Sequence, residues 1–254
     1  MKAHERVTAA IRAANDAGRT GLVPFVTAGY PEPRDFISTL KSVAAVGDVV
    51  EVGIPFSDPM ADGMTIQRSS FEALRKGVSL AWIFDELERA GGFDAPLVMM
   101  SYLNPLLAFG YERLADRALE TGVCGFIVPD LPFEESAEIR AVLESRGLGL
   151  IQLVTPATPD GRLKTLCDAS RGFVYAVTIT GITGGDVGLP GDLAGYLDKV
   201  SAVADLPVCA GFGIRQASDV AAVGAHAAGA IVGSALVEVL ERGEDPAGFL
   251  TALR

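Results

Sequence analysis

The chain alternates short apolar runs with longer amphipathic stretches along its whole length. Each apolar run ends at Gly, Pro, Ser or Thr, and an uninterrupted apolar run is typical of a parallel strand buried on both faces. The longer stretches repeat apolar residues at helical spacing, as Phe36, Leu40 and Val43 do. The pattern predicts strands at residues 22–27, 49–52, 96–100, 125–128, 148–154, 172–177, 207–210 and 228–232.

A helix is expected before the first strand and after each of the eight. The N-terminal one spans residues 1–19, with Val7 and Ile11 at helical spacing. Glu134 and Glu135 are expected in the first turn of a later helix, where the helix dipole favours acidic side chains. The remaining helices are predicted at residues 34–46, 65–76, 80–90, 111–121, 134–146, 159–169, 192–203, 216–224 and from 235 to 241, with a loop at 101–105.

Strands that alternate with helices predict a parallel sheet. Eight such units in 254 residues match a closed (β/α)₈ TIM barrel with an extra N-terminal helix. No composition break divides the chain, so we expect one domain over residues 1–254, although the length alone also allows two smaller domains.

Charge and hydropathy exclude several classes of partner. The net charge of −11 and pI of about 4.7 repel nucleic acid and anionic membranes, so neither partner is expected. Residues 220–237 carry no charge over eighteen positions, which is long enough for a membrane span. Glycines at 224, 229 and 233 interrupt this run, so a helix end, a strand and a turn are predicted instead.

The cysteines and histidines predict neither disulfides nor a metal site. Cys124, Cys167 and Cys209 are odd in number and form no CxxC pair, which is typical of free thiols in a reducing compartment. The charged N-terminus does not resemble a signal peptide, and a cytoplasmic location is expected. His4 and His226 lack partners at ligand spacing, so no zinc, catalytic triad or cofactor is expected.

Residues 48–63 carry four carboxylates and no Lys or Arg. Glu51 interrupts an apolar strand, where a carboxylate is costly unless it is paired or used. It could pair with an Arg, reach solvent at the strand end, or bind a divalent metal with Asp58 and Asp62. The carboxyl ends of barrel strands carry the active site, and this position favours a catalytic Glu51.

Glycines follow the last three predicted strands, at 181–185, 211–213 and Gly233-Ser234. They let backbone N–H groups approach an anion, and barrels bind phosphate at this edge, so a phosphate site is favoured over simple turns. The connection at residues 178–190 is long and predicts either a lid over bound ligand, with Thr183 facing inward, or a plain surface loop.

Six segments of the sequence look like the signature of one known family, and they lie at residues 24–31, 51–63, 65–67, 129–136, 181–184 and 211–214. In these segments the sequence resembles the tryptophan synthase alpha chain family. The match runs in order across the chain, and the Glu51–Gly63 segment is highly specific. Two positions depart from the family pattern: Met64 replaces an expected proline, and Gly185 replaces a small non-glycine residue.

The resemblance implies cleavage of indole-3-glycerol phosphate to indole and glyceraldehyde 3-phosphate, and a PLP-dependent beta chain as partner in an alpha2beta2 assembly. It implies that Glu51 is the catalytic acid/base and that Asp62 faces the indole N–H. It places Phe25, Tyr102, Tyr175 and Phe212 around the indole, and Gly184, Gly213, Gly233 and Ser234 around the phosphate.

Two rival functions remain open on the sequence. One is another phosphate-binding barrel isomerase or decarboxylase, which would share the late glycines but does not suit the Glu51–Gly63 segment. The other is a non-catalytic subunit that activates its partner. Such a subunit would keep the partner-facing segments at 55–57 and 129–132 but tolerate the loss of Glu51.

Overall fold

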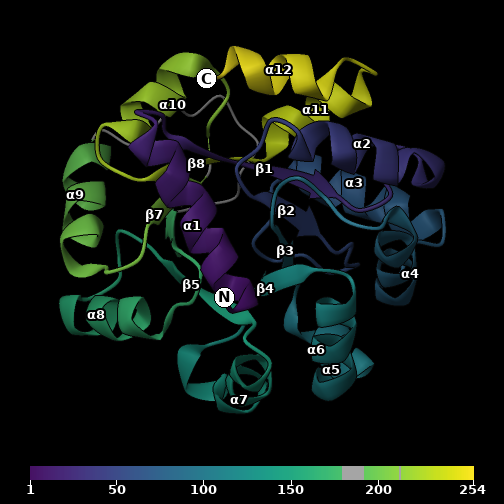
Figure 1. Cartoon of the computed structure of the whole chain (residues 1–254), viewed down its shortest axis with the longest axis horizontal. Helices are drawn as coiled ribbons and strands as arrows, with labels where there is room; N and C mark the ends of the chain where they lie inside the picture. The colour runs from purple at the N-terminus through teal and green to yellow at the C-terminus, as the bar shows by residue number, and fades with distance from the viewer. Residues whose placement is uncertain (179–191, 212) are drawn as a thin grey trace.

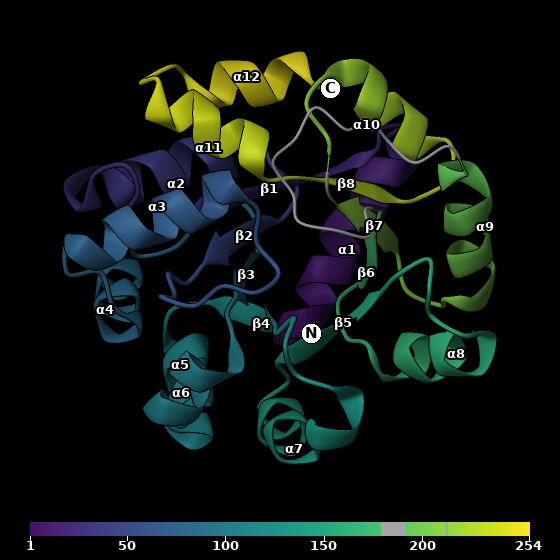
Figure 2. The same ribbon diagram turned by 180° about the vertical axis from the view of Figure 1, so that it is seen from behind.

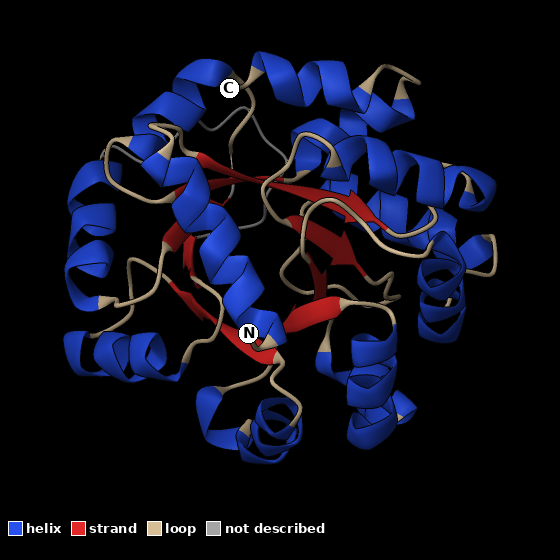
Figure 3. Cartoon of the chain, in the orientation of Figure 1, coloured by secondary structure: helices blue, strands red, loops and turns tan. Residues whose placement is uncertain are grey.

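The computed structural model describes residues 1–178, 192–211 and 213–254. Within these ranges, eight parallel strands pair in sequence order and β8 pairs with β1, which closes a barrel (Figure 1, Figure 3). The predicted (β/α)₈ fold is therefore confirmed. The strands are β1 (Gly21–Thr27), β2 (Val50–Gly53), β3 (Leu97–Met100), β4 (Val123–Ile127), β5 (Gly149–Val154), β6 (Val174–Val177), β7 (Val208–Gly211) and β8 (Gly229–Val232).

Helices surround the barrel, and most follow a strand, as the sequence pattern predicted (Figure 1). Their apolar faces pack on the outer surface of the sheet in one continuous core. They are α1 (Ala3–Asp16), α2 (Phe36–Ala44), α3 (Met64–Arg75), α4 (Leu80–Ala90), α5 (Leu103–Phe109), α6 (Tyr111–Glu120), α7 (Ala137–Ser145), α8 (Asp160–Ala169), α9 (Leu193–Val203), α10 (Ala217–Gly224), α11 (Ser234–Glu241) and α12 (Pro246–Ala252).

The strands bury both faces, which explains their uninterrupted apolar runs. On β2, Val50 and Val52 pack outward among the helices, whereas Val49, just before the strand, belongs to the cluster inside the barrel. Successive side chains alternate between the two faces, so Glu51 shares the inner face with Val49. Glu51, the one carboxylate in the described strands, therefore lies inside the barrel.

Helix α1 covers the end of the barrel where the strands begin, and Figure 1 shows it lying across that end. Val7 and Ile11 join the interior cluster, and the Thr8 hydroxyl donates to the Gly172 carbonyl at 2.6 Å. Figure 2 shows the opposite end, where the strands finish and the loops between strands and helices gather. A ligand site inside the barrel must therefore be reached from that second end.

Two helices were missed by the sequence prediction. Residues 101–105 were expected to form a loop, but α5 begins at Leu103 and has Pro105 in its first turn, where proline needs no N–H acceptor. Helix α12 was also missed, although Asp245 caps it by accepting from the Ala247 N–H at 3.0 Å and Pro246 is its first residue. Both helices have seven residues, too few to show a clear period.

The helix expected from residue 134 begins later than predicted. Glu134 and Glu135 lie in a 3₁₀ turn, Phe133–Glu135, and α7 follows from Ala137, so the expectation that they form the first turn of the α-helix was wrong. Among the described residues, no helix is both long and apolar enough to cross a membrane. The uncharged run at 220–237 is divided between α10, β8 and the start of α11.

Candidate active site

Glu51 is buried inside the barrel, with 1% of its surface exposed. It is in register with Phe25 on β1 and Val98 on β3, one layer below the carboxyl end of β2. In the described part of the chain, no Lys or Arg forms an ion pair with it, and its Oε2 atom has no hydrogen-bond partner. The suggestion that Glu51 pairs with an arginine therefore finds no support.

Burial raises the pKa of Glu51 to about 8, because the ionised form loses its hydration, and the negative charge of Asp62 adds to the rise. At neutral pH Glu51 is therefore mostly protonated. A carboxyl group with a pKa near the working pH is suited to both donating and accepting a proton.

Asp62 lies in the loop between β2 and α3 and is 9% exposed. Burial raises its pKa to about 6, and a hydrogen bond from Tyr102 opposes that rise because it stabilises the carboxylate. At pH 7 the site therefore holds one protonated and one ionised carboxyl group. Environments that separate two pKa values in this way mark acid and base roles.

Tyr102 connects the loops that follow β2, β3 and β4. Its hydroxyl accepts from the Ala61 N–H at 2.8 Å and donates to the Asp62 carboxylate. Its ring stacks on Phe56 with centroids 5.2 Å apart. The next residue donates its N–H to Asp130 Oδ1 at 2.9 Å. Tyr102 therefore holds Asp62 in place as well as contributing an aromatic wall.

Two further aromatic rings lie beside the carboxyl groups. Tyr175 on β6 is buried, and its hydroxyl would lie 2.5 Å from a Cβ placed on Gly211 at the end of β7. Burial raises the pKa of Tyr175, and the negative charge of Glu51 contributes to the rise. A Cβ on Gly53 would collide with the Phe25 ring. Glycines at the ends of β2 and β7 thus leave room for these rings.

The N-terminus of α11 is open. Gly233 precedes the helix, Ser234 is its first residue, and no side chain in the described ranges caps it. Among the atoms of the described residues, a Cβ on Gly233 would have only the Phe25 Cβ nearby, at 4.0 Å, so the space in front of the helix adjoins the aromatic pocket. By contrast, Asp219 already caps α10 by accepting from the Arg215 and Gln216 N–H groups.

The described residues of the acidic loop do not bring three metal-ligating side chains together. In the part of the chain that the structure describes, no three His, Cys, Asp or Glu side chains are placed to hold an ion. Asp58 is exposed and accepts from its neighbour Ser57. The reading of Glu51, Asp58 and Asp62 as metal ligands is therefore not supported.

Comparisons with known proteins agree with this geometry. The family model described as tryptophan synthase alpha chain matches residues 11–251. The alpha chain of Nitratidesulfovibrio vulgaris strain DP4 is 43% identical over 249 residues, which are 97% of both chains. That of Roseiflexus sp. strain RS-1 is 44% identical, covering 89% of this chain and 88% of its own. This chain belongs to the tryptophan synthase alpha chain family.

Solved structures give the same result. A chain of Mycobacterium tuberculosis tryptophan synthase superimposes with a TM-score of 0.89 at 34% identity, covering 98% of this chain and 96% of its own. The alpha chain from Legionella pneumophila gives 0.87 at 30% identity, covering 100% and 96%. As a member of this family, the protein is a lyase of tryptophan biosynthesis.

Most residues singled out from the alpha-chain resemblance lie together at the carboxyl end of the barrel. Glu51, Asp62 and Tyr175 are electrostatically coupled, Tyr102 contacts Asp62, and Phe25 lies between Gly53 and Gly233. Gly213 follows β7 with a φ of 86°, which favours glycine. Thr183, Gly184 and Phe212 lie outside the described residues, as does the lid predicted at 178–190 except for Thr178.

Sequence reasoning missed two residues that support Asp62. Gln67 donates from Nε2 to the Asp62 carbonyl at 2.8 Å, which fixes the backbone of that residue. Phe56 stacks on Tyr102 but was assigned only to partner contacts. Both lie within or next to the acidic loop, so their proximity to Asp62 in sequence was the available signal.

Proposed function

We propose that this chain cleaves indole-3-glycerol phosphate to indole and glyceraldehyde 3-phosphate by retro-aldol acid/base catalysis. One observation carries the proposal: Glu51 is a buried carboxyl group without an ion-pair partner in the described chain, with a pKa near 8. Next to it, Asp62 has a pKa near 6. The pair supplies a proton donor and a fixed negative charge in one apolar pocket.

The reaction breaks the bond between the indole ring carbon and the carbon that carries the neighbouring hydroxyl. Protonated Glu51 donates its proton to the ring carbon, and the resulting carboxylate accepts the proton of that hydroxyl. The O–H electrons form the aldehyde, and the electrons of the broken bond restore the aromatic ring. Glu51 ends protonated, ready for the next substrate.

Asp62 stabilises the intermediate. Protonation of the ring places positive charge on the ring nitrogen, and a carboxylate fixed there lowers the energy of that charge as it develops. Tyr102 holds this carboxylate and keeps its pKa down. Phe25, Tyr102 and Tyr175 provide the walls for the indole ring, together with Phe212 outside the described residues.

The phosphate is assigned to the glycine-rich edge. The open N-terminus of α11, with Gly233 and Ser234, offers unpaired N–H groups and the positive end of a helix dipole. Gly213, after β7, has no side chain of its own, so its backbone can approach the phosphate closely. Gly184 and Thr183 complete the proposed site from the loop outside the described ranges. No basic side chain is required, which suits the negative surface.

We also propose a PLP-dependent beta chain as partner, in an alpha2beta2 assembly, and a cytoplasmic location. Mycobacterium tuberculosis tryptophan synthase, to which this chain is similar, has been solved in an aminoacrylate-bound form. At the site end of the barrel, Met60 and Leu107 expose apolar side chains, at 78% and 58%. The partner-facing segments at 55–57 and 129–132 lie in the neighbouring loops. Indole release from indole-3-glycerol phosphate tests the activity itself.

Asp62→Asn is expected to reduce turnover by at least about 10²-fold, because it removes the charge that stabilises the protonated ring. Asp58→Asn is the matched control, since Asp58 lies in the same loop but is exposed, and its turnover should stay within a few-fold of wild type. Steady-state indole release measures both. If Asp62→Asn lost only a few-fold in turnover, Asp62 would have a structural role and not a catalytic one.

Tyr102→Phe removes the hydroxyl that donates a hydrogen bond to the Asp62 carboxylate. Phenylalanine keeps the ring stack with Phe56 but loses the hydrogen bond that lowers the pKa of Asp62. The acidic limb of the kcat/KM profile, near pH 6 in the wild type, should therefore move to higher pH. An unmoved limb would show that the hydroxyl does not act on Asp62.

A further inference from the structure

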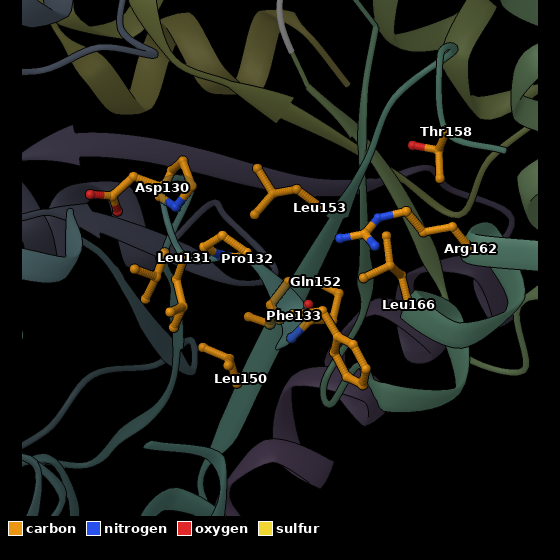
Figure 4. Close-up of a pocket in the computed structure, with 13 residues that line it drawn as sticks. Asp130, Leu131, Pro132, Phe133, Leu150, Gln152, Leu153, Thr158, Arg162 and Leu166 are labelled. Atoms are coloured by element: carbon orange, nitrogen blue, oxygen red, sulfur yellow. The ribbon is translucent and has the colours of Figure 1, made fainter. Parts of the chain in front are cut away.

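Asp130 lies in the loop after β4, at one edge of a pocket lined by that loop, strand β5 and helix α8 (Figure 4). In this view its carboxylate points away from the other labelled residues, and Arg162 across the pocket binds Glu134 instead. Among the described residues, no Lys or Arg forms an ion pair with Asp130. A half-buried carboxylate without a cation needs another hydrogen-bond partner.

The partner of Asp130 is the start of helix α5. Its Oδ1 atom accepts from the Leu103 N–H at 2.9 Å, which is its one side-chain hydrogen bond in the described chain. Leu103 is the first residue of α5, and the side chain of Tyr102, the residue before it, does not cap the helix. Asp130 therefore caps α5 from a loop that comes 27 positions after Leu103.

The loop around Asp130 is constrained at the end of β4. Pro129, the residue before it, has a fixed φ. The Leu131 N–H donates to the Val128 carbonyl at 3.2 Å and closes a turn over Asp130. The carboxylate is thus held against the barrel, and its hydrogen bond holds the backbone next to Tyr102 in the same place.

The side chain of Tyr102 carries this constraint to the proposed active site. Its hydroxyl accepts from the Ala61 N–H at 2.8 Å and donates to the Asp62 carboxylate. Burial raises the pKa of Tyr102, and the negative charges of Asp62 and Asp130 add to the rise, so the hydroxyl stays protonated and remains a donor. One peptide group and one side chain therefore connect Asp130 to Asp62.

We propose that Asp130 is a positioning residue for the reaction at Asp62. Its bond to the Leu103 N–H fixes where the Tyr102 hydroxyl lies, and that hydroxyl fixes the Asp62 carboxylate. The proposal rests on the function proposed above, in which ionised Asp62 stabilises the protonated indole ring. Asp130 acts through Tyr102 and not on the substrate, and its removal costs turnover because a displaced carboxylate stabilises the ring charge less well.

The first test measures the Asp62 carboxyl group directly and needs no substrate. Carbon-13 NMR of the full chain with labelled aspartate carboxyl groups follows its titration, and Asp62→Asn identifies its signal. Asp130→Ala should raise the pKa of Asp62 by about one unit, because Asp62 loses the hydrogen bond from Tyr102. The other titratable groups coupled to Asp62 in the described chain, Glu51 and Tyr175, are unchanged in this variant. An unchanged pKa of Asp62 would overturn the proposal, whether or not the chain releases indole.

Two comparison variants separate positioning from stability. Asp130→Asn keeps an oxygen that accepts from the Leu103 N–H, so the pKa of Asp62 should stay close to its wild-type value. Asp245→Ala removes an aspartate cap from α12, another helix of seven residues, and should lower stability without moving the pKa of Asp62. A shift in either variant as large as that in Asp130→Ala would contradict the proposal.

A double variant tests the route through Tyr102. In the Tyr102→Phe background the hydroxyl is already absent, so Asp130→Ala should not raise the pKa of Asp62 further. In the otherwise wild-type chain, Asp130→Ala should lower kcat for indole release about tenfold with little change in KM, because the phosphate edge is unaltered. A full additional pKa shift in the double variant, or a raised KM with unchanged kcat in Asp130→Ala, would reject the proposed role.

Discussion

Glu51→Gln abolishes indole release, with turnover falling by at least about 10³-fold. Glutamine keeps the size of the side chain and its neutral hydrogen-bonding edge but can neither donate a carboxyl proton nor accept one. The neighbouring carboxyl group of raised pKa is Asp62, but its pKa of about 6 leaves it ionised at pH 7, so it has no proton to donate in place of Glu51. Removal of a general acid/base costs about 10²–10⁴-fold, and here one group serves both proton transfers.

Two controls separate chemistry from folding and binding. Glu244→Gln changes an exposed glutamate paired with Arg242 and should turn over like the wild type. Glycerol 3-phosphate should bind Glu51→Gln and wild type equally, because the glycine-rich edge is unaltered. Turnover near the wild-type value in Glu51→Gln would remove Glu51 from the mechanism.

Glu51→Gln also makes the protein more stable than the wild type at alkaline pH, by up to about 5 kcal/mol at pH 9. Folding raises the pKa of Glu51 from 4.5 to about 8, so between these values the folded state binds more protons than the unfolded state. Protonated Glu51 therefore stabilises the folded wild type fully below pH 4.5, and this stabilisation is lost as the pH rises through 8. Each pKa unit corresponds to about 1.4 kcal/mol.

Urea denaturation followed by circular dichroism at pH 5, 7 and 9 measures the effect. The two proteins should be close in stability at pH 5 and diverge as the pH rises. Glu134→Gln is the matched control, because the pKa of Glu134 is lowered to about 2 and neither state titrates it between pH 5 and 9. Parallel pH dependences of wild type and Glu51→Gln would show that Glu51 ionises at its ordinary pKa.

The fold was predictable because its strands are buried on both faces, which makes them uninterrupted apolar runs, and because Gly and Pro mark where many of them begin or end. The period of two along a strand also fixed the direction of Glu51 once its neighbours Val50 and Val52 were known to pack outward. Helices α5 and α12 were missed because seven residues show little periodicity and each contains a proline, which is usually taken as a stop signal.

The supporting contacts of the site were not predictable from local pattern. Tyr102 was expected as a wall of the indole pocket, and only the fold brings its hydroxyl to Ala61, 41 positions earlier in the chain. The separation of the Glu51 and Asp62 pKa values depends on burial in three dimensions.

We propose that this chain itself breaks a carbon–carbon bond of indole-3-glycerol phosphate, without a contribution from the beta chain to the chemistry. The direct measurement incubates the purified chain with that substrate, alone and with a beta chain, and quantifies indole and glyceraldehyde 3-phosphate. We expect both products in equal amounts from the chain alone, and faster release when the beta chain is present. Absence of indole under both conditions, from a chain with the folded circular-dichroism spectrum, would contradict it.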